Sequence, residues 1–306
     1  MEGLIKIEGK PLEKLIEVVS NGIGTLYRPR AIKNEADAKA YAIKVIEKAK
    51  HEAIAEGKLI EAENLDRINE RLVAKEIKRQ NNIDDVIELA VNDLNQTESI
   101  IDVPVEQDWS TRFFDIVQDV SDNEMKILWG KILAGEVKRP KSYSLRTLEL
   151  LRNLSKEEAD IFVKVSQFVL KQNDYFIFDG DEMSQLGISY IDIAKLTEIG
   201  LIQAGTFVHK EYKSLPDKDN KIGIQYKDYV IIISIQSGAD NISLPINCLT
   251  TAGKELYQLI DVTPNIDYIK IIGDYIKKQK ASAEYSKIYS INHKGGISYQ
   301  TPTIKI

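Results

Sequence analysis

Apolar residues recur at helical spacing through most of the first half of this 306-residue chain. The first stripe predicts an amphipathic helix that ends before Pro29, because its members fall three or four positions apart. Two interpretations stay open: the stripe packs on the core or on a neighbouring subunit, or it lies in a membrane surface as an effector element. The stripe consists of Leu12, Leu15, Ile16, Val19, Ile23 and Leu26.

From Asn34 to Arg79 the chain contains no proline, which predicts one helix about 70 Å long at 1.5 Å per residue. Its apolar positions repeat every eleven residues, which is typical of a nearly straight helix rather than a left-handed coiled coil. Because so thin a stripe stabilises a lone helix poorly, we expect copies of this helix to lie against one another, with a solvated single helix as the alternative. The stripe comprises Ile43, Ile46, Ile54, Leu65, Ile68 and Leu72.

A second amphipathic segment begins at Ile83, and a group of short helices follows from residue 100. Both tryptophans, Trp109 and Trp129, lie on apolar faces of these helices. The residues from Ser121 to Glu124 have the pattern of a capping box, which predicts the start of the helix that carries Trp129.

Charged and hydroxyl side chains crowd the turn that follows this helix. Arg139, Ser144 and Arg146 are our candidates for contact with an anion or a partner, because a helix begins at Ser144 and its amides would face the same ligand. The alternative is an ordinary charged turn in which Arg146 pairs with Glu149 or Glu136.

After residue 155 the pattern changes to short helices and strands, in the order of a winged helix-turn-helix. The polar stretch 210–227 would form an enlarged wing. The predicted elements are a helix after a capping box at Ser155, a strand at Tyr175–Phe178, a helix at Ile191–Ile199, a strand at Tyr229–Ile235 and a helix from Leu249.

Together these patterns predict a mainly α fold with a winged-helix-like α+β module near its end. The predicted parts are an amphipathic N-terminal segment (1–33), a long helix and oligomerisation region (34–99), a helical core (100–154), the winged-helix-like module (155–262), and a C-terminal helix and tail (263–306).

Composition narrows the class of protein. A net charge of −6 argues against a global nucleic-acid surface, which needs an excess of Lys and Arg. The single cysteine, Cys248, cannot form an intrachain disulfide and suits a reducing compartment. The sequence shows no signal-peptide pattern and no apolar stretch of about 20 residues, so we expect a cytoplasmic protein.

The sequence lacks the usual motifs for catalysis and for cofactors. Its histidines, His51, His209 and His293, have no second ligand at metal-binding spacing. Neither a Gly-x-x-x-x-Gly-Lys-Ser/Thr phosphate loop nor a Gly-x-Ser-x-Gly elbow occurs. We therefore expect no metal, no cofactor and no enzyme activity. An enzyme that acts on a phosphorylated ligand at Arg139 and Arg146 is the remaining catalytic hypothesis.

The segment 189–199 would be the recognition helix of the winged module. It offers Lys195 against Asp192 and Glu198, so its surface would repel phosphate. We interpret the module as a protein-interaction fold. The alternative is a nucleic-acid-binding regulator that uses the wing lysines Lys210, Lys213, Lys218 and Lys221.

Three segments, Trp109–Phe114, Leu128–Glu136 and Ser144–Leu148, resemble the core of a bacterial family catalogued as domain of unknown function 2806. Residues 11–29 are also similar to that family and, more loosely, to the Abi-alpha group associated with abortive infection. The resemblance implies no established catalytic residue, so none is assigned from it.

These observations lead us to expect a non-enzymatic, oligomeric helical scaffold or effector. The long helix would assemble copies of the chain, while the C-terminal module would hold a protein partner. The likeness to Abi-alpha implies a phage-defence component that acts through self-assembly and through contact with a partner or a peripheral membrane surface. A winged-helix regulator that binds nucleic acid is the alternative.

Overall fold

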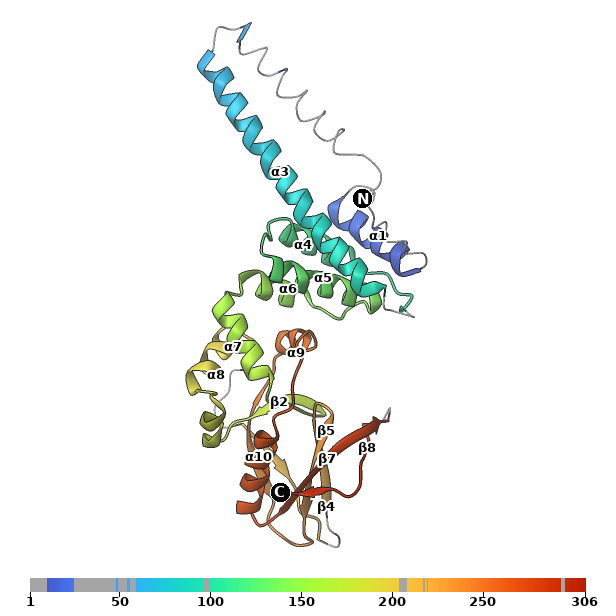
Figure 1. Cartoon of the computed structure of the whole chain (residues 1–306), viewed down its shortest axis with the longest axis vertical. Coiled ribbons are helices and arrows are strands. Elements are labelled where there is room, and N and C mark those ends of the chain that lie inside the picture. Colours follow the sequence, from blue (N-terminus) through green and yellow to red (C-terminus); the bar gives the residue numbers. More distant parts are fainter. Residues whose placement is uncertain are drawn as a thin grey trace. The chain divides into compact units, whose positions relative to one another are not determined.

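The chain divides into two compact units, Met1–Leu148 and Glu149–Ile306 (Figure 1). The first unit is built of helices, and the second contains a large antiparallel sheet with helices around it. The finer division into five parts stays a prediction. The computed structural model describes residues 10–24, 48, 54–55, 59–95, 100–203, 208–216, 218, 220–292 and 295–306.

The helices of the first unit follow the apolar periodicity of the sequence. Asp122 caps α5 by accepting a hydrogen bond from the Met125 amide at 2.9 Å, so the cap lies one residue after the predicted Ser121. Asp and Ser are equally good caps, and the sequence alone therefore does not choose between them. The helices are α1 (Lys10–Ile23), α3 (Leu59–Leu94), α4 (Gln107–Val117), α5 (Asn123–Lys138) and α6 (Leu145–Asn153). The boundary between the two units falls within α6.

Helix α3 is one uninterrupted helix of 36 residues, which corrects the two segments predicted on either side of residue 80. Its C-terminal half packs on α5, and the close approach occurs at Gly130, where a Cβ would lie 2.7 Å from the Cβ of Leu89. The part of the predicted helix before residue 59 lies outside the described residues, apart from residues 48, 54 and 55. The buried apolar residues of the C-terminal half are Ile83, Val86, Ile87, Ala90 and Leu94.

Aromatic side chains of α4 and α5 form the core of the first unit. Trp109 stacks on Phe113 with ring centroids 5.0 Å apart, and Phe113 meets Trp129 edge-on at 5.5 Å. The indole Nε1 of Trp109 donates a hydrogen bond of 2.7 Å to the carbonyl oxygen of Tyr143. The tryptophan segments therefore build the inside of this unit and not an exposed surface.

Among the described residues, the second unit contains nine strands joined in one antiparallel sheet of order β3-β6-β2-β1-β4-β5-β7-β8, with β9 paired to β7. This sheet overturns the expectation of a mainly α fold, because the second unit is plainly α+β. The interior strand β5, between β4 and β7, is buried along most of its length. The strands are β1 (Val169–Gln172), β2 (Asp174–Phe178), β3 (His209–Tyr212), β4 (Asn220–Tyr226), β5 (Tyr229–Ile235), β6 (Ile242–Cys248), β7 (Ser282–Ile291), β8 (Ile297–Tyr299) and β9 (Ile304–Lys305).

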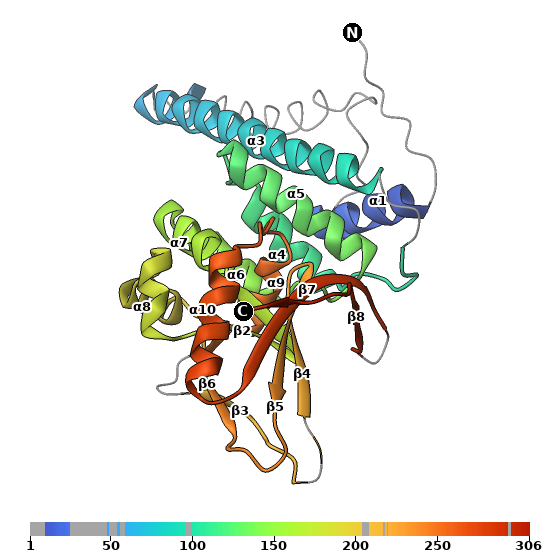
Figure 2. The ribbon, with the colours of Figure 1, turned by 60° about the horizontal axis from the view of Figure 1, so that its bottom comes forward.

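The helices of the second unit begin where capping residues predict. Ser155 and Glu158 form the predicted capping box, and Ser189 and Asp192 form another. The longest of these helices, α10, lies against β7, as Figure 2 shows. The helices are α7 (Lys156–Ser166), the 3-10 helix η1 (Asp181–Leu186), α8 (Tyr190–Glu198), α9 (Thr251–Tyr257) and α10 (Ile266–Lys278).

The polar stretch 210–227 does not form a single wing. Its first part belongs to β3, which pairs with β6, whereas its later part belongs to β4, which pairs with β1 and β5. The two strands therefore lie at different places in the sheet: Lys210 belongs to β3 and Lys221 to β4, whereas Lys213 and Lys218 lie between the two strands.

Candidate functional site

The turn between α5 and α6 closes around the carboxylate of Glu136, a residue that is only 2% exposed. One carboxylate oxygen accepts a hydrogen bond from the Lys141 amide at 2.6 Å, and the other accepts from the amides of Ser142 at 2.9 Å and Tyr143 at 3.1 Å. Lys141 has a φ of +72°, which brings these successive amides toward one acceptor. Glu136 therefore satisfies the turn amides of residues 141–143, which precede the amides of the helix predicted to begin at Ser144.

The three predicted residues of this turn lie at the end of α5 and around the start of α6. Arg139 and Arg146 are exposed, and Ser144 is half-buried. The Ser144 hydroxyl accepts a hydrogen bond from the Thr147 amide at 3.3 Å, so it caps α6. Contact with an anion or partner stays a prediction for the two exposed arginines.

The apolar face of α1 lies against the protein's own core. Leu15 and Val19 are fully buried, and α1 packs mainly on α4. The two helices approach most closely at Gly22, where a Cβ would lie 2.2 Å from a ring carbon of Phe114. Membrane contact through this face would require α1 to leave α4. Of the remaining predicted residues, Leu12, Ile16 and Ile23 are half-buried, and Leu26 lies outside the described residues.

Two residues of the predicted oligomer face, Ile68 and Leu72, are exposed on α3. Ile68 is 44% exposed and Leu72 is 50% exposed, although both are large aliphatic residues. Ile54, which precedes α3, is also exposed, and Leu65 is half-buried. Ile68 and Leu72 of α3 therefore face solvent, while the C-terminal half of the helix is part of the core. Ile43 and Ile46 lie outside the described residues.

Charge is unevenly distributed along the sequence of the N-terminal part of α3. Acidic residues predominate in 59–69, whereas basic residues predominate in 70–80. The guanidinium of Arg79 pairs with the Asp119 carboxylate at 2.8 and 3.0 Å within the first unit. Residues 59–69 contain three acidic side chains, Glu61, Glu63 and Asp66, and one basic side chain, Arg67. Residues 70–80 contain four basic side chains, Arg71, Lys75, Lys78 and Arg79, and two acidic ones, Glu70 and Glu76.

Lys210, one of the four predicted wing lysines, makes contacts within the second unit. The ammonium of Lys210 donates a hydrogen bond of 3.0 Å to the Gln172 carbonyl and lies 4.9 Å from the ring centroid of Phe176. Burial lowers the pKa of Lys210, against the opposing effects of Cys248 and Asp174. Lys213, Lys218 and Lys221 are exposed.

The charged side chains of α8 are engaged by α7. Asp192 accepts a hydrogen bond of 3.0 Å from Lys164, and Lys195 pairs with Glu157. Tyr190 and its neighbour Ile191 are exposed at the start of this helix. The surface of α8 is therefore apolar at its N-terminal end.

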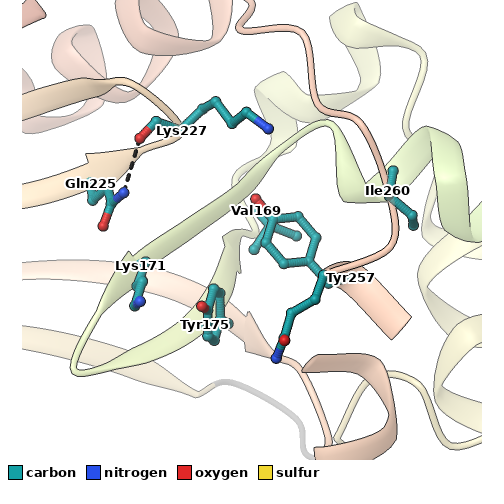
Figure 3. Close-up of a pocket in the computed structure, with 8 residues that line it drawn as sticks. Val169, Lys171, Tyr175, Gln225, Lys227, Tyr257 and Ile260 are labelled. Atoms are coloured by element: carbon teal, nitrogen blue, oxygen red, sulfur yellow. Dashed lines mark hydrogen bonds between the residues drawn. The ribbon is translucent and has the colours of Figure 1, made fainter. Parts of the chain in front are cut away.

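A pocket of about 210 Å³ opens where β1 and β4 separate (Figure 3). The two strands share a single residue pair, Lys171 with Gln225, and beyond it the end of α9 lines the opening. The residues of this pocket come from three distant segments and form no motif, so the pocket could not be predicted from the sequence. The lining residues are Val169, Lys171, Tyr175, Gln225, Lys227, Tyr257, Gln258 and Ile260.

Two stretches of the chain, residues 66–177 and 180–273, match the family described as "Protein of unknown function (DUF2806)". The chain belongs to this family. The match to DUF2806 covers most of α3, the aromatic core and the larger part of the second unit, which confirms the family resemblance of the tryptophan segments. The likeness of residues 11–29 to Abi-alpha lies outside the matched ranges and stays a prediction, as does a role in phage defence. No curated protein and no solved structure matches the chain.

Within the described part of this DUF2806 chain, no group of three His, Cys, Asp or Glu side chains is placed to hold a metal ion. None of the helices in the same part is both long and apolar enough to cross a membrane. Cys248 is half-buried, and burial raises the pKa of its thiol, which favours the unreactive protonated form.

Proposed function

We propose that this DUF2806 protein is a self-associating scaffold without a catalytic role, in which the exposed half of α3 binds α3 of a second copy. The observation that supports the proposal is the exposure of Ile68 and Leu72 on a helix whose other half is core. Complete burial of a fully exposed side chain of this size contributes about 1.5–3 kcal/mol, and covering the exposed half of Ile68 or Leu72 contributes about half of that.

The charge distribution along α3 favours a copy that runs antiparallel. An antiparallel neighbour places its basic stretch 70–80 beside the acidic stretch 59–69, and the reverse contact forms at the same time. Ile68 then lies opposite Leu72 of the other copy. Such a contact uses the same surface of both chains and closes as a twofold dimer.

The exposed half of α3 also sets the expected strength of the dimer. Residues 59–80 span about 33 Å at 1.5 Å per residue, and the stripe that they carry is thin. A contact of this length buries less than the roughly 1,600 Å² of a standard interface. We therefore expect a dimer that dissociates on dilution, with a dissociation constant in the micromolar range.

The proposal is tested with the double variant Ile68→Glu/Leu72→Glu in sedimentation velocity runs over a range of concentrations. The control is Ile127→Glu, which places the same carboxylate at a residue of α5 that is 47% exposed. We expect the wild type and the control to dimerise and the double variant to stay monomeric with an unchanged melting temperature. A wild type that is monomeric at roughly 100 µM, or a double variant that still dimerises, contradicts the proposal.

A further inference from the structure

Among the described residues, the pocket between β1 and β4 is lined by two lysines and by no acidic side chain. Lys171 and Lys227 line it, and within the described part of the chain neither ammonium has an acidic partner. The carboxylate of Asp174, next to Tyr175 in the chain, pairs instead with Lys254 at 2.7 Å. None of the eight lining residues is acidic.

The backbone at Lys227 is strained in a way that points to a role for its side chain. Lys227 lies in the tight turn between β4 and β5 with a φ of +54°, a conformation that favours Asn or Gly. The side-chain amide of Gln225 stabilises this turn by donating a hydrogen bond of 3.0 Å from its Nε2 to the Lys227 carbonyl oxygen. Figure 3 shows the Lys227 side chain extending from this turn. Strain of this kind is common at binding sites.

The rest of the lining combines neutral donors with an apolar surface. Burial raises the pKa of Tyr257 to about 12, so its hydroxyl keeps the proton that it can donate. The rings of Tyr257 and Tyr175 lie 5.5 Å apart, and the Lys171 ammonium lies 5.0 Å from the Tyr175 ring centroid. Val169 and Ile260 supply aliphatic surface beside these rings.

We propose that this pocket binds a small organic phosphate. The ammonium groups of Lys171 and Lys227 neutralise the dianionic phosphate, and the Tyr257 hydroxyl donates to one of its oxygens. The organic part of the ligand packs on the tyrosine rings and Val169. A volume of about 210 Å³ is below the usual range for ligand pockets and limits the ligand to a small one.

The test is calorimetric titration of the full chain with phenyl phosphate, with inorganic phosphate and phenol titrated separately. We expect phenyl phosphate to bind more tightly than either of the other two, with an affinity that falls as salt is added. Inorganic phosphate that binds as tightly as phenyl phosphate would overturn the proposed role of the organic part. Failure of phenyl phosphate to bind at about 10 mM would overturn the proposal as a whole.

Two variants test the lysines. Lys227→Asn and Lys171→Gln should each weaken phenyl phosphate binding about tenfold, the usual effect of losing one charge-assisted hydrogen bond. Asn suits the left-handed turn, so Lys227→Asn should melt at or above the wild-type temperature. The matched control, Lys221→Gln, alters an exposed lysine of β4 outside the pocket and should leave the dissociation constant unchanged. Wild-type affinity in both pocket variants would contradict the proposal.

The binding site and the proposed dimer contact lie in different units, so their failures can be told apart. The double variant Ile68→Glu/Leu72→Glu should bind phenyl phosphate like the wild type. Loss of dimerisation with retained binding separates the two proposals, and loss of binding in this variant would contradict the assignment of the ligand to the β1–β4 pocket.

Discussion

Glu136 is the side chain on which the turn between α5 and α6 depends. Its carboxylate accepts three backbone amides, so Glu136→Gln replaces one acceptor oxygen with an NH2 group that faces another donor. We expect a loss of about 2 kcal/mol in the free energy of unfolding, measured in urea. Glu88→Gln, at an exposed position of α3, is the control and should change it by less than about 0.5 kcal/mol. Equal unfolding midpoints for the two variants would contradict this account of the turn.

Asp192 makes the second unit sensitive to acid. Burial acts to raise the pKa of Asp192, but hydrogen bonds from the Ser189 amide, from Lys164 and from the Ser189 hydroxyl outweigh burial and hold the pKa below its usual value. A carboxylate with a lowered pKa stabilises the fold above its unfolded pKa, and this contribution is lost as the pH falls below about 4.

Asp192→Asn should therefore lose stability less steeply than the wild type between about pH 5 and pH 3. The measurement is the free energy of unfolding of each protein in urea at both pH values. The control is Asp160→Asn, which alters an exposed aspartate of α7 and should retain the wild-type pH dependence. An equally steep loss in Asp192→Asn would show that Asp192 does not cause the sensitivity.

At the residue scale, the sequence predicted contacts between near neighbours. The capping box of Ser155 and Glu158 could be predicted because its partners are three positions apart and both side chains are typical of it. The contacts of Glu136 could not, because they depend on the left-handed backbone of Lys141, where neither Gly nor Asn marks the turn.

The packing of α1 on α4 depends on the absence of a side chain at Gly22. Within a helix, Gly→Ala normally stabilises by about 1 kcal/mol. Here the added Cβ would lie 2.2 Å from a ring carbon of Phe114 and 2.7 Å from the Ser110 carbonyl oxygen, and overpacking costs about 1–3 kcal/mol. We expect Gly22→Ala to lower the free energy of unfolding by about 1 kcal/mol.

Asn21→Ala is the control for this prediction, because Asn21 is the exposed neighbour in the same helix. It should leave the free energy of unfolding unchanged or raise it by a few tenths of a kcal/mol. If Gly22→Ala stabilises the protein as much as Asn21→Ala does, α1 does not pack closely on α4.

At the element scale, regular apolar spacing predicted the helices. Strands whose apolar alternation is accompanied by charged residues or proline were not predicted. In β4, Ile222, Ile224 and Tyr226 alternate as in a half-buried strand, but flanking Lys and Asp residues favoured a polar wing. Pro245 similarly obscured the strand pattern of β6, although this strand pairs on both sides. These overlooked strands account for the wrong prediction of a mainly α fold.

At the scale of the whole molecule, the sequence indicated an apolar stripe on a long helix but gave no sign of the pocket. The stripe could be predicted because its residues belong to one helix with regular spacing. The pocket depends on β1 and β4 separating after the pair Lys171 and Gln225, and on α9 entering beside them. Such an arrangement arises only in the tertiary structure, and no regular spacing of residues in the sequence indicates it.

The central claim is that copies of this chain associate through the exposed half of α3, and the direct measurement is the mass of the full chain by light scattering. We predict that the mass rises with concentration from 34.6 kDa toward twice that value, and that Ile68→Glu/Leu72→Glu stays at 34.6 kDa. A wild-type mass of 34.6 kDa at every concentration, or the same rise in the double variant, would contradict the claim.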